Sequence, residues 1–157
     1  MKALNKLFVG IGLSLAMLSA QAAELTTVPA LSLQDQHEAP LALNAQTQWV
    51  LYSTDKASGK ITKESLEALG LTDLSAANGI YIADVSAMPS MITKLFALPK
   101  MRDYAFKAAI VMDDELLSDW PKQEEKVTAM KLNGLKVESI EYFDSPETLQ
   151  AWIQKQL

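Results

Sequence analysis

Apolar and polar residues form a three-part pattern at the start of the chain. Lys2 and Lys6 precede an uncharged apolar run over 7–18, and Ala20-Gln21-Ala22 follows with small residues at alternate positions. This order is typical of a cleavable secretory signal peptide. The run is too short to cross a bilayer, which takes about 20 residues. We therefore expect residues 1–22 to be a signal peptide. A short buried helix and an uncleaved anchor are the alternatives.

The rest of the chain opens with a weak alternation and continues with β-rich runs. Apolar residues alternate on both sides of a polar turn at 34–38, which predicts a loose entry hairpin or arm. Residues 49–53 (WVLYS) form an uninterrupted run, as expected for a central strand buried on both faces. Further buried strands are predicted over 80–85 and 106–112.

Two stretches between these strands have helical spacing. Leu66 and Leu69 give the first helix a buried side, and Gly70 is a suitable C-terminal cap. The second helix is predicted over 89–96, with Ser86 as its N-cap. One face of that helix is apolar: Met91, Ile92, Leu95 and Phe96. The methionines are interpreted as core-filling residues: Met88, Met91, Met101, Met112 and Met130.

The C-terminal part carries the clearest local signals. Two β-rich runs, 127–132 and 135–143, flank Asn133-Gly134, a pair that favours a two-residue hairpin turn. A phase change along the second run predicts a bulge near Ser139. The pair Ser145-Pro146 then begins a final helix. Its predicted buried residues are Leu149, Trp152 and Ile153.

Composition and charge narrow the class of protein. The 157 residues include no cysteine, so an exported form folds without disulfides. Removing Lys2 and Lys6 takes two from the 14 basic residues, against 19 acidic ones, and gives a net charge of −7. An acidic chain without a basic stripe is poorly suited to nucleic acid or an anionic membrane surface. We expect a single domain over 23–157 in the periplasm, with no membrane insertion after cleavage.

The order strand, helix, strand, helix, strand, hairpin, helix resembles that of the thioredoxin-like superfamily. The stretch 28–43 (VPALSLQDQHEAPLAL) is also similar to the arm of exported thioredoxin-like and peroxiredoxin-like proteins. The resemblance implies an α/β fold: a three-layer sandwich around a central mixed sheet, with a C-terminal β-hairpin and a closing helix.

The reactive centre of that superfamily is missing from the sequence. The resemblance places the redox C-x-x-C motif at Ala57-Ser58-Gly59-Lys60, where there is no cysteine. A peroxiredoxin T-x-x-C motif would begin at Thr54 and again end at Ala57. The proline that precedes the third central strand in the family is replaced by Phe106-Lys107. A thiolate nucleophile needs sulfur, so thiol catalysis is excluded.

Other catalytic or metal-binding sets find little support. His37, the only histidine, lies in a polar turn, which argues against a Ser-His-Asp triad and against zinc. The acidic run 113–119 is most simply a solvated loop, with a cation site as the alternative. Its carboxylates are Asp113, Asp114, Glu115 and Asp119. No glycine fingerprint of a nucleotide cofactor is present, and we expect no cofactor and no metal.

The turn 53–60 (STDKASGK) is the best candidate for a binding surface. It follows a predicted buried strand and precedes a helix, a place where free amides attract anions. A structural turn with a helix cap is the simpler alternative. We predict that binding residues come from this turn: Thr54, Lys56, Ser58 and Lys60.

Together these features predict an exported, non-catalytic thioredoxin-like domain that binds a protein or peptide partner in the envelope. The alternative is a small-anion or small-ligand binding protein, or a non-thiol enzyme. That alternative would use the turn 53–60 with nearby carboxylates such as Asp84.

The signal peptide gives a direct prediction. We expect the mature protein to begin at Ala23, because small residues occupy positions 20 and 22 as signal peptidase requires. N-terminal sequencing of the protein from an envelope fraction measures this. A mature chain that still carries residues 7–18 would contradict it.

Overall fold

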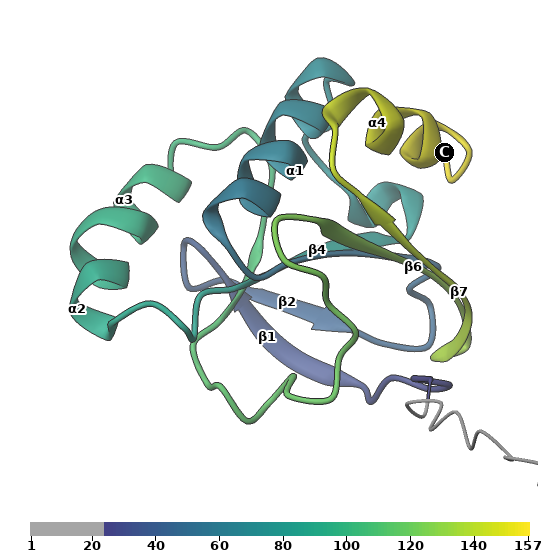
Figure 1. The fold of residues 1–157 in the computed structure, drawn as a ribbon, viewed down its shortest axis with the longest axis horizontal. Coiled ribbons are helices and arrows are strands. Elements are labelled where there is room, and N and C mark those ends of the chain that lie inside the picture. Colours follow the sequence, from purple (N-terminus) through teal and green to yellow (C-terminus); the bar gives the residue numbers. More distant parts are fainter. Residues whose placement is uncertain (1–23) are drawn as a thin grey trace, which may run out of the picture.

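The computed structural model describes residues 24–157, so the predicted signal peptide and its cleavage site lie outside the described residues. Seven strands form one mixed sheet in the order β2-β1-β5-β4-β3-β6-β7 (Figure 1). The strands are β1 (Leu31–Asp35), β2 (Pro40–Leu43), β3 (Trp49–Ser53), β4 (Gly79–Asp84), β5 (Ala109–Val111), β6 (Val127–Asn133) and β7 (Lys136–Phe143). Within 24–157 no helix has the length and apolar character needed to cross a membrane.

The helical segments connect and flank these strands. They are α1 (Lys56–Ala68), the short 3₁₀ turn η1 (Ser75–Ala77), α2 (Ser90–Ile92), the π-helical turn η2 (Thr93–Ala97), α3 (Leu98–Met101) and α4 (Pro146–Gln154). Segments α2, η2 and α3 follow one another without a break, and we call them together helix 90–101.

The three central strands run parallel, and the outer strands run antiparallel to their neighbours. Strand β4 pairs in parallel with β3 and β5, while β1 and β6 join β5 and β3 in the antiparallel sense. The carboxyl ends of β3, β4 and β5 therefore meet at one edge of the sheet. The start of α1, the loop 85–89 and the loop 112–126 all leave from this edge.

Helices α1 and α4 cover one face of the sheet (Figure 1). Trp49 of β3 packs against Trp152 of α4 with an edge-to-face geometry and a centroid distance of 6.3 Å. The indole of Trp49 also donates a hydrogen bond to the carbonyl of Ala77 (2.9 Å). A Cβ at Gly79 would lie 2.2 Å from this indole ring, so only glycine fits beneath it.

The opposite face is covered by the loop 112–126 and the N-terminal segment. Leu117 and Trp120 are buried there, and Trp120 meets Tyr52 edge-to-face at 5.2 Å. Thr128 of β6 fixes the loop by donating a hydrogen bond to the carbonyl of Pro121 (2.9 Å). The loop 112–126, which contains the acidic run 113–119, therefore forms part of the third layer of the fold.

Three predicted local features are confirmed: the end of α1, the start of α4 and the bulge in β7. Gly70 follows α1 with a φ of 65°, and Leu71 N donates to the Leu66 carbonyl (3.0 Å), which closes the helix as expected. Ser145 caps α4, and the predicted residues Leu149, Trp152 and Ile153 are buried. The predicted bulge is also present, because Ser139 pairs with Lys131 whereas Val137 pairs with Leu132.

The hairpin turn lies one residue later than predicted. The residues with positive φ are Gly134 and Leu135, at 56° and 70°, and not Asn133 and Gly134. Asn133 belongs to β6 and pairs with Lys136. The bulge leaves Glu138 of β7 unpaired, between the pairs Lys131–Ser139 and Leu132–Val137. The position of the turn is therefore set by the register of the sheet and not by the local preference of Asn-Gly.

The prediction that the apolar face of the second helix and the methionines fill the core is wrong in part. The helix begins at Ser90 and has no side-chain cap. Ser86 does not cap it, and the backbone amide of Ser86 donates a hydrogen bond to the carboxylate of Asp84 (2.9 Å). Met101 and Met130 are buried, but Met91 and Met112 are exposed. The inward positions of helix 90–101 are taken by Thr93 and Met101, and the four residues of its predicted apolar face are exposed instead.

The polar turn 34–38 is not wholly solvated. Gln36 is 2% exposed, and its amide nitrogen donates to the carbonyls of Met101 (3.2 Å) and Phe106 (2.7 Å). Its amide oxygen accepts from Ala108 N (2.9 Å). These side-chain bonds replace strand pairing over 106–108, which explains why β5 is shorter than the predicted strand 106–112.

Replacing Gln36 should therefore destabilise the fold. Gln36→Glu removes the donor and places a carboxylate against two carbonyl oxygens, and we expect a loss of about 3 kcal/mol in the free energy of unfolding. Gln34→Glu makes the same change on the exposed side of β1 and should alter stability by less than about 0.5 kcal/mol. Urea unfolding measures both. Equal stability of the two variants would show that the bonds of Gln36 contribute nothing.

Candidate functional site

The start of α1 lies at the sheet edge where the three parallel strands end. Ser53 is the last residue of β3, and its hydroxyl lies 2.7 Å from the hydroxyl of Tyr81 on β4. The turn at Thr54 and Asp55 then leads into α1. Helix starts at this edge are common ligand sites in α/β proteins, since free backbone amides point outward there.

A capping box closes the start of α1. The carboxylate of Asp55 accepts a hydrogen bond from Ser58 N (2.7 Å), and the hydroxyl of Ser58 accepts from Asp55 N (3.2 Å). Ser58 is fully buried. Its side chain therefore stabilises the turn from within and does not form part of an exposed surface.

Asp55 also ties the helix start to the loop 112–126. Its second carboxylate oxygen accepts a hydrogen bond from Glu125 N (2.8 Å). Burial raises the pKa of Asp55, but the hydrogen bonds from Ser58 and Glu125 outweigh it and hold the pKa below its usual 3.8. The carboxylate is thus ionised at neutral pH and already occupies the place that a bound anion would take.

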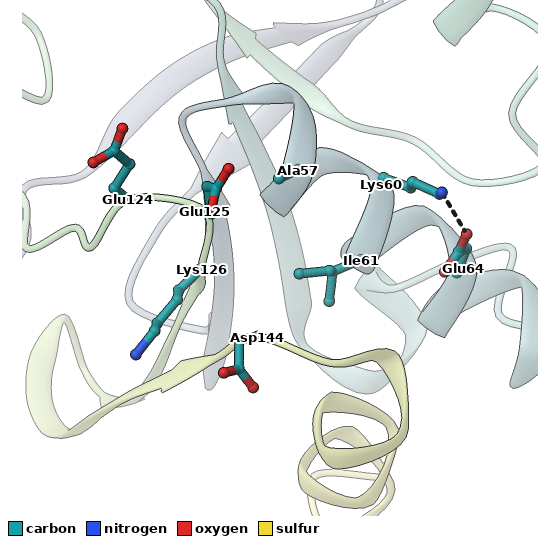
Figure 2. Close-up of a pocket in the computed structure, with 8 residues that line it drawn as sticks. All are labelled: Ala57, Lys60, Ile61, Glu64, Glu124, Glu125, Lys126 and Asp144. Carbon is teal, nitrogen blue, oxygen red and sulfur yellow. Dashed lines mark ion pairs between the residues drawn. The ribbon is translucent and has the colours of Figure 1, made fainter.

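An open pocket lies beside this turn, between α1, the end of the loop 112–126 and the segment that joins β7 to α4 (Figure 2). Its walls carry four carboxylates against two ammonium groups. The lining residues are Ala57, Lys60, Ile61, Glu64, Glu124, Glu125, Lys126 and Asp144. Ala57, where the resemblance places a reactive cysteine, forms part of the wall without any nucleophilic group.

The charges around the pocket work against the expected affinity for anions. Lys60 turns toward Glu64, with a distance of 3.8 Å between the charged groups, so its charge is shared with a neighbour on the helix (Figure 2). Such exposed pairs contribute little to stability, but the neighbouring carboxylate weakens the attraction of Lys60 for a bound anion. The surplus of carboxylates suits a cationic group better than a small anion.

The polar residues behind the turn are held neutral or paired. Burial raises the pKa of Tyr81 to about 12. Burial and the neighbouring carboxylate of Asp84 raise the pKa of Tyr52 above its ordinary value, and the hydroxyl of Tyr52 donates to Asp84 (3.2 Å). Neither phenol ionises at neutral pH, and Asp84 is engaged with Tyr52, so this set offers no free general base.

The predicted binding residues are brought together only in part. Thr54 is half-buried, and Lys56 and Lys60 are exposed, so these three remain candidates for a binding surface. His37 is exposed beyond the end of β1, and β1 is antiparallel to β5. His37 therefore lies at the opposite edge of the sheet from the turn and does not serve it.

No metal centre forms from the acidic residues that the structure describes. Among residues 24–157, no three histidine or carboxylate side chains are grouped as metal ligands. In the loop 113–119, Asp113 instead accepts a hydrogen bond from Glu115 N (2.9 Å), which is an ordinary loop contact.

A second candidate surface was missed by sequence reasoning. Four large apolar residues of helix 90–101 are exposed and form what we call the outer stripe: Met91, Ile92, Leu95 and Phe96. Their helical spacing was visible in the sequence, but spacing alone does not say which side of a helix faces the core. The smaller face with Thr93 is the signal that could have identified the inward side.

The sequence matches no family model and no curated protein. Solved structures do match over most of the chain. A peroxiredoxin-like protein from Aquifex aeolicus has 9% identity and a TM-score of 0.54, covering 87% of this chain and 90% of that one. StoA from Bacillus subtilis has 10% identity and a TM-score of 0.52, with 80% and 96% covered. A Chlorobium tepidum protein described as a thiol:disulfide interchange protein, DsbE, has 12% identity and a TM-score of 0.55, with 83% and 92% covered.

Likeness at these identities establishes the fold alone. The chain has a thioredoxin-like fold, which confirms the predicted fold class, and it has no cysteine anywhere in its sequence.

The cap of α1 should make stability depend on pH. Asp55→Ala should lower the free energy of unfolding by about 1–2 kcal/mol at neutral pH, because it removes the acceptor that caps α1. The lowered pKa of Asp55 means that its contribution is complete above pH 3.8 and is lost as the pH falls through the lower folded-state value. The difference in free energy of unfolding between wild type and Asp55→Ala should therefore become smaller in acid. Urea unfolding between pH 2.5 and 7 measures it, with Asp55→Asn as a control that keeps a capping oxygen. A gap that stays constant over this range would contradict the assignment.

Proposed function

We propose that this chain, a cysteine-free protein with a thioredoxin-like fold, is an exported, non-catalytic domain that binds a protein or peptide partner in the periplasm. The observation that carries the proposal is the start of α1. Ala57 and Lys60 occupy the positions where the resemblance places the two cysteines, and the helix start carries a capping box formed by Asp55 and Ser58. The chain has the thioredoxin-like fold but no cysteine to perform thiol chemistry.

The surroundings of this position supply no replacement for the thiol. The described residues that line the nearby pocket are carboxylates, lysines and small or apolar side chains, with no histidine among them. Buried Tyr81 and Tyr52 stay protonated at neutral pH. A nucleophile activated by an adjacent base, as covalent catalysis requires, is not formed by these groups.

Export rests on the sequence before the described residues. The charged, apolar and small-residue segments over 1–22 fit a signal peptide. A domain without cysteine also suits an oxidising compartment, because it cannot be trapped in wrong disulfides.

The rival function, a small-anion binder at the turn 53–60, has weaker support. Asp55 fills the helix N-terminus, and the pocket beside it carries more carboxylates than lysines. Lys56 and Lys60 remain available for a partner that brings its own carboxylates, and their part in binding stays a prediction.

Two measurements test the proposal. Immobilised mature protein should retain a specific envelope protein that free mature protein competes away. Insulin reduction and peroxide turnover should both stay at background, since no thiolate can form. Stoichiometric oxidation of methionine by peroxide does not count as turnover. The proposal fails if no retained protein is competed, or if a catalytic peroxidase or reductase rate persists after metal chelation.

A further inference from the structure

Helix 90–101 exposes more apolar surface than a helix packed on a sheet normally does. The exposed fractions are 69% for Met91, 61% for Leu95 and 65% for Phe96, with Ile92 at 42%. These residues are adjacent along two helical turns. A contiguous exposed apolar patch on a soluble domain marks an interaction site.

The other side of helix 90–101 also packs little against the rest of the protein. Thr93 and Met101 are its buried positions, and in the described part of the chain the helix has no extensive contact with any strand, with α1 or with α4. Figure 1 shows it standing to one side of the layers formed by the sheet and these two helices. Short helices gain most of their stability from packing an apolar face, so this helix lacks its usual partner.

The charge around the outer stripe differs from that of the whole chain. Every charged residue from 85 to 102 is basic, namely Lys94, Lys100 and Arg102, and all three are exposed. Neither lysine takes part in the ion pairs found within residues 24–157. The nearest carboxylates along the chain are Asp84, which binds Tyr52 and Ser86, and Asp103. The stripe is thus an apolar strip with a cationic border on an acidic protein.

We propose that the outer stripe docks an amphipathic segment of the partner protein that presents apolar anchors flanked by carboxylates. This inference rests on the proposed partner-binding function and names its surface. Apolar anchors would bury Leu95 and Phe96, and carboxylates would pair with Lys94 and Lys100. Helical peptides commonly bind in this way, with anchors spaced over two turns. Charge complementarity then adds specificity and speed of association.

The same charges disfavour two other occupants. Two copies of this chain joined stripe to stripe would bring Lys94 and Lys100 of both copies together without an acidic residue between 85 and 102 to pair with them. An anionic membrane is an extended surface, so it would attract the stripe but also face the rest of the mature chain, whose net charge is −7. A short peptide segment meets mainly the charges beside the stripe.

Two synthetic peptides provide the direct test. Both are amphipathic helices of about 18 residues with leucine anchors, long enough to fold on binding. One carries glutamate and the other lysine beside the anchors. Fluorescence anisotropy with mature protein should show the acidic peptide binding at least about tenfold tighter at low salt, with the difference shrinking as salt screens the charges. Equal affinity for both peptides, or binding of neither, overturns the proposal.

Variants assign the binding to the stripe. Leu95→Ser/Phe96→Ser should weaken binding of the acidic peptide by about tenfold or more, while its unfolding midpoint stays near that of wild type, because both residues are exposed. Lys94→Ala/Lys100→Ala should reduce the salt dependence. Lys131→Ala/Lys136→Ala is the matched control, with the same loss of charge at two exposed positions of the β6–β7 hairpin, and should leave affinity within about twofold. If the control variant weakens binding as much as the stripe variant does, the assignment to helix 90–101 is wrong.

The alternative occupants give separate outcomes. Co-sedimentation with phosphatidylglycerol vesicles that depends on Leu95 and Phe96 would replace the partner segment by a membrane surface. A concentration-dependent dimer in light scattering that the same variant abolishes would replace it by a second copy. Either result overturns the proposal.

The envelope experiment separates this inference from the proposed function. A retained partner that is competed equally well by wild type and by Leu95→Ser/Phe96→Ser keeps the function and refutes the stripe. The absence of any competed partner refutes the function itself.

Discussion

Strand β3 lies inside the sheet between β4 and β6, and all five of its residues are buried, so both faces of the sheet must be covered along the whole length of this strand. On one face, the indole of Trp49 lies over Gly79 and against α4, which leaves no room for a side chain at position 79. On the other, Tyr52 is covered by Trp120 from a loop. Helices α1 and α4 and the loop 112–126 provide most of this cover, to which helix 90–101 adds Met101.

The start of α1 is an ordered, capped helix N-terminus that carries no cysteine. Asp55 accepts hydrogen bonds from Ser58 on the helix and from Glu125 on the loop, so a single carboxylate orders the turn and the segment beside it. In thiol enzymes the free amides of such a helix start lower the pKa of a cysteine. In this chain the amide of Ser58 is occupied by a capping side chain, and Ala57 has no group to activate.

The two candidate surfaces differ in charge and in polarity. The pocket beside α1 is mostly acidic and open to solvent, with Ile61 as its main apolar wall. The outer stripe is apolar with a basic border, and its four side chains are 42–69% exposed. Apolar burial provides most of the free energy of protein association, whereas exposed charges mainly add specificity. The stripe therefore has the stronger physical basis for holding a protein partner.

The sequence by itself determined the order of elements, the capped ends of α1 and α4, the buried strand β3 and the absence of thiol chemistry, because these depend on local spacing and residue type. Only the tertiary structure decided that Gln36 is buried, that the hairpin turns at Gly134 and Leu135, and which side of helix 90–101 faces inward. Each of these depends on what approaches from a distant part of the chain. Periodicity shows that a helix has an apolar face, but whether that face is buried depends on whether another element reaches it, and here α1, α4 and the loop 112–126 have already covered the sheet.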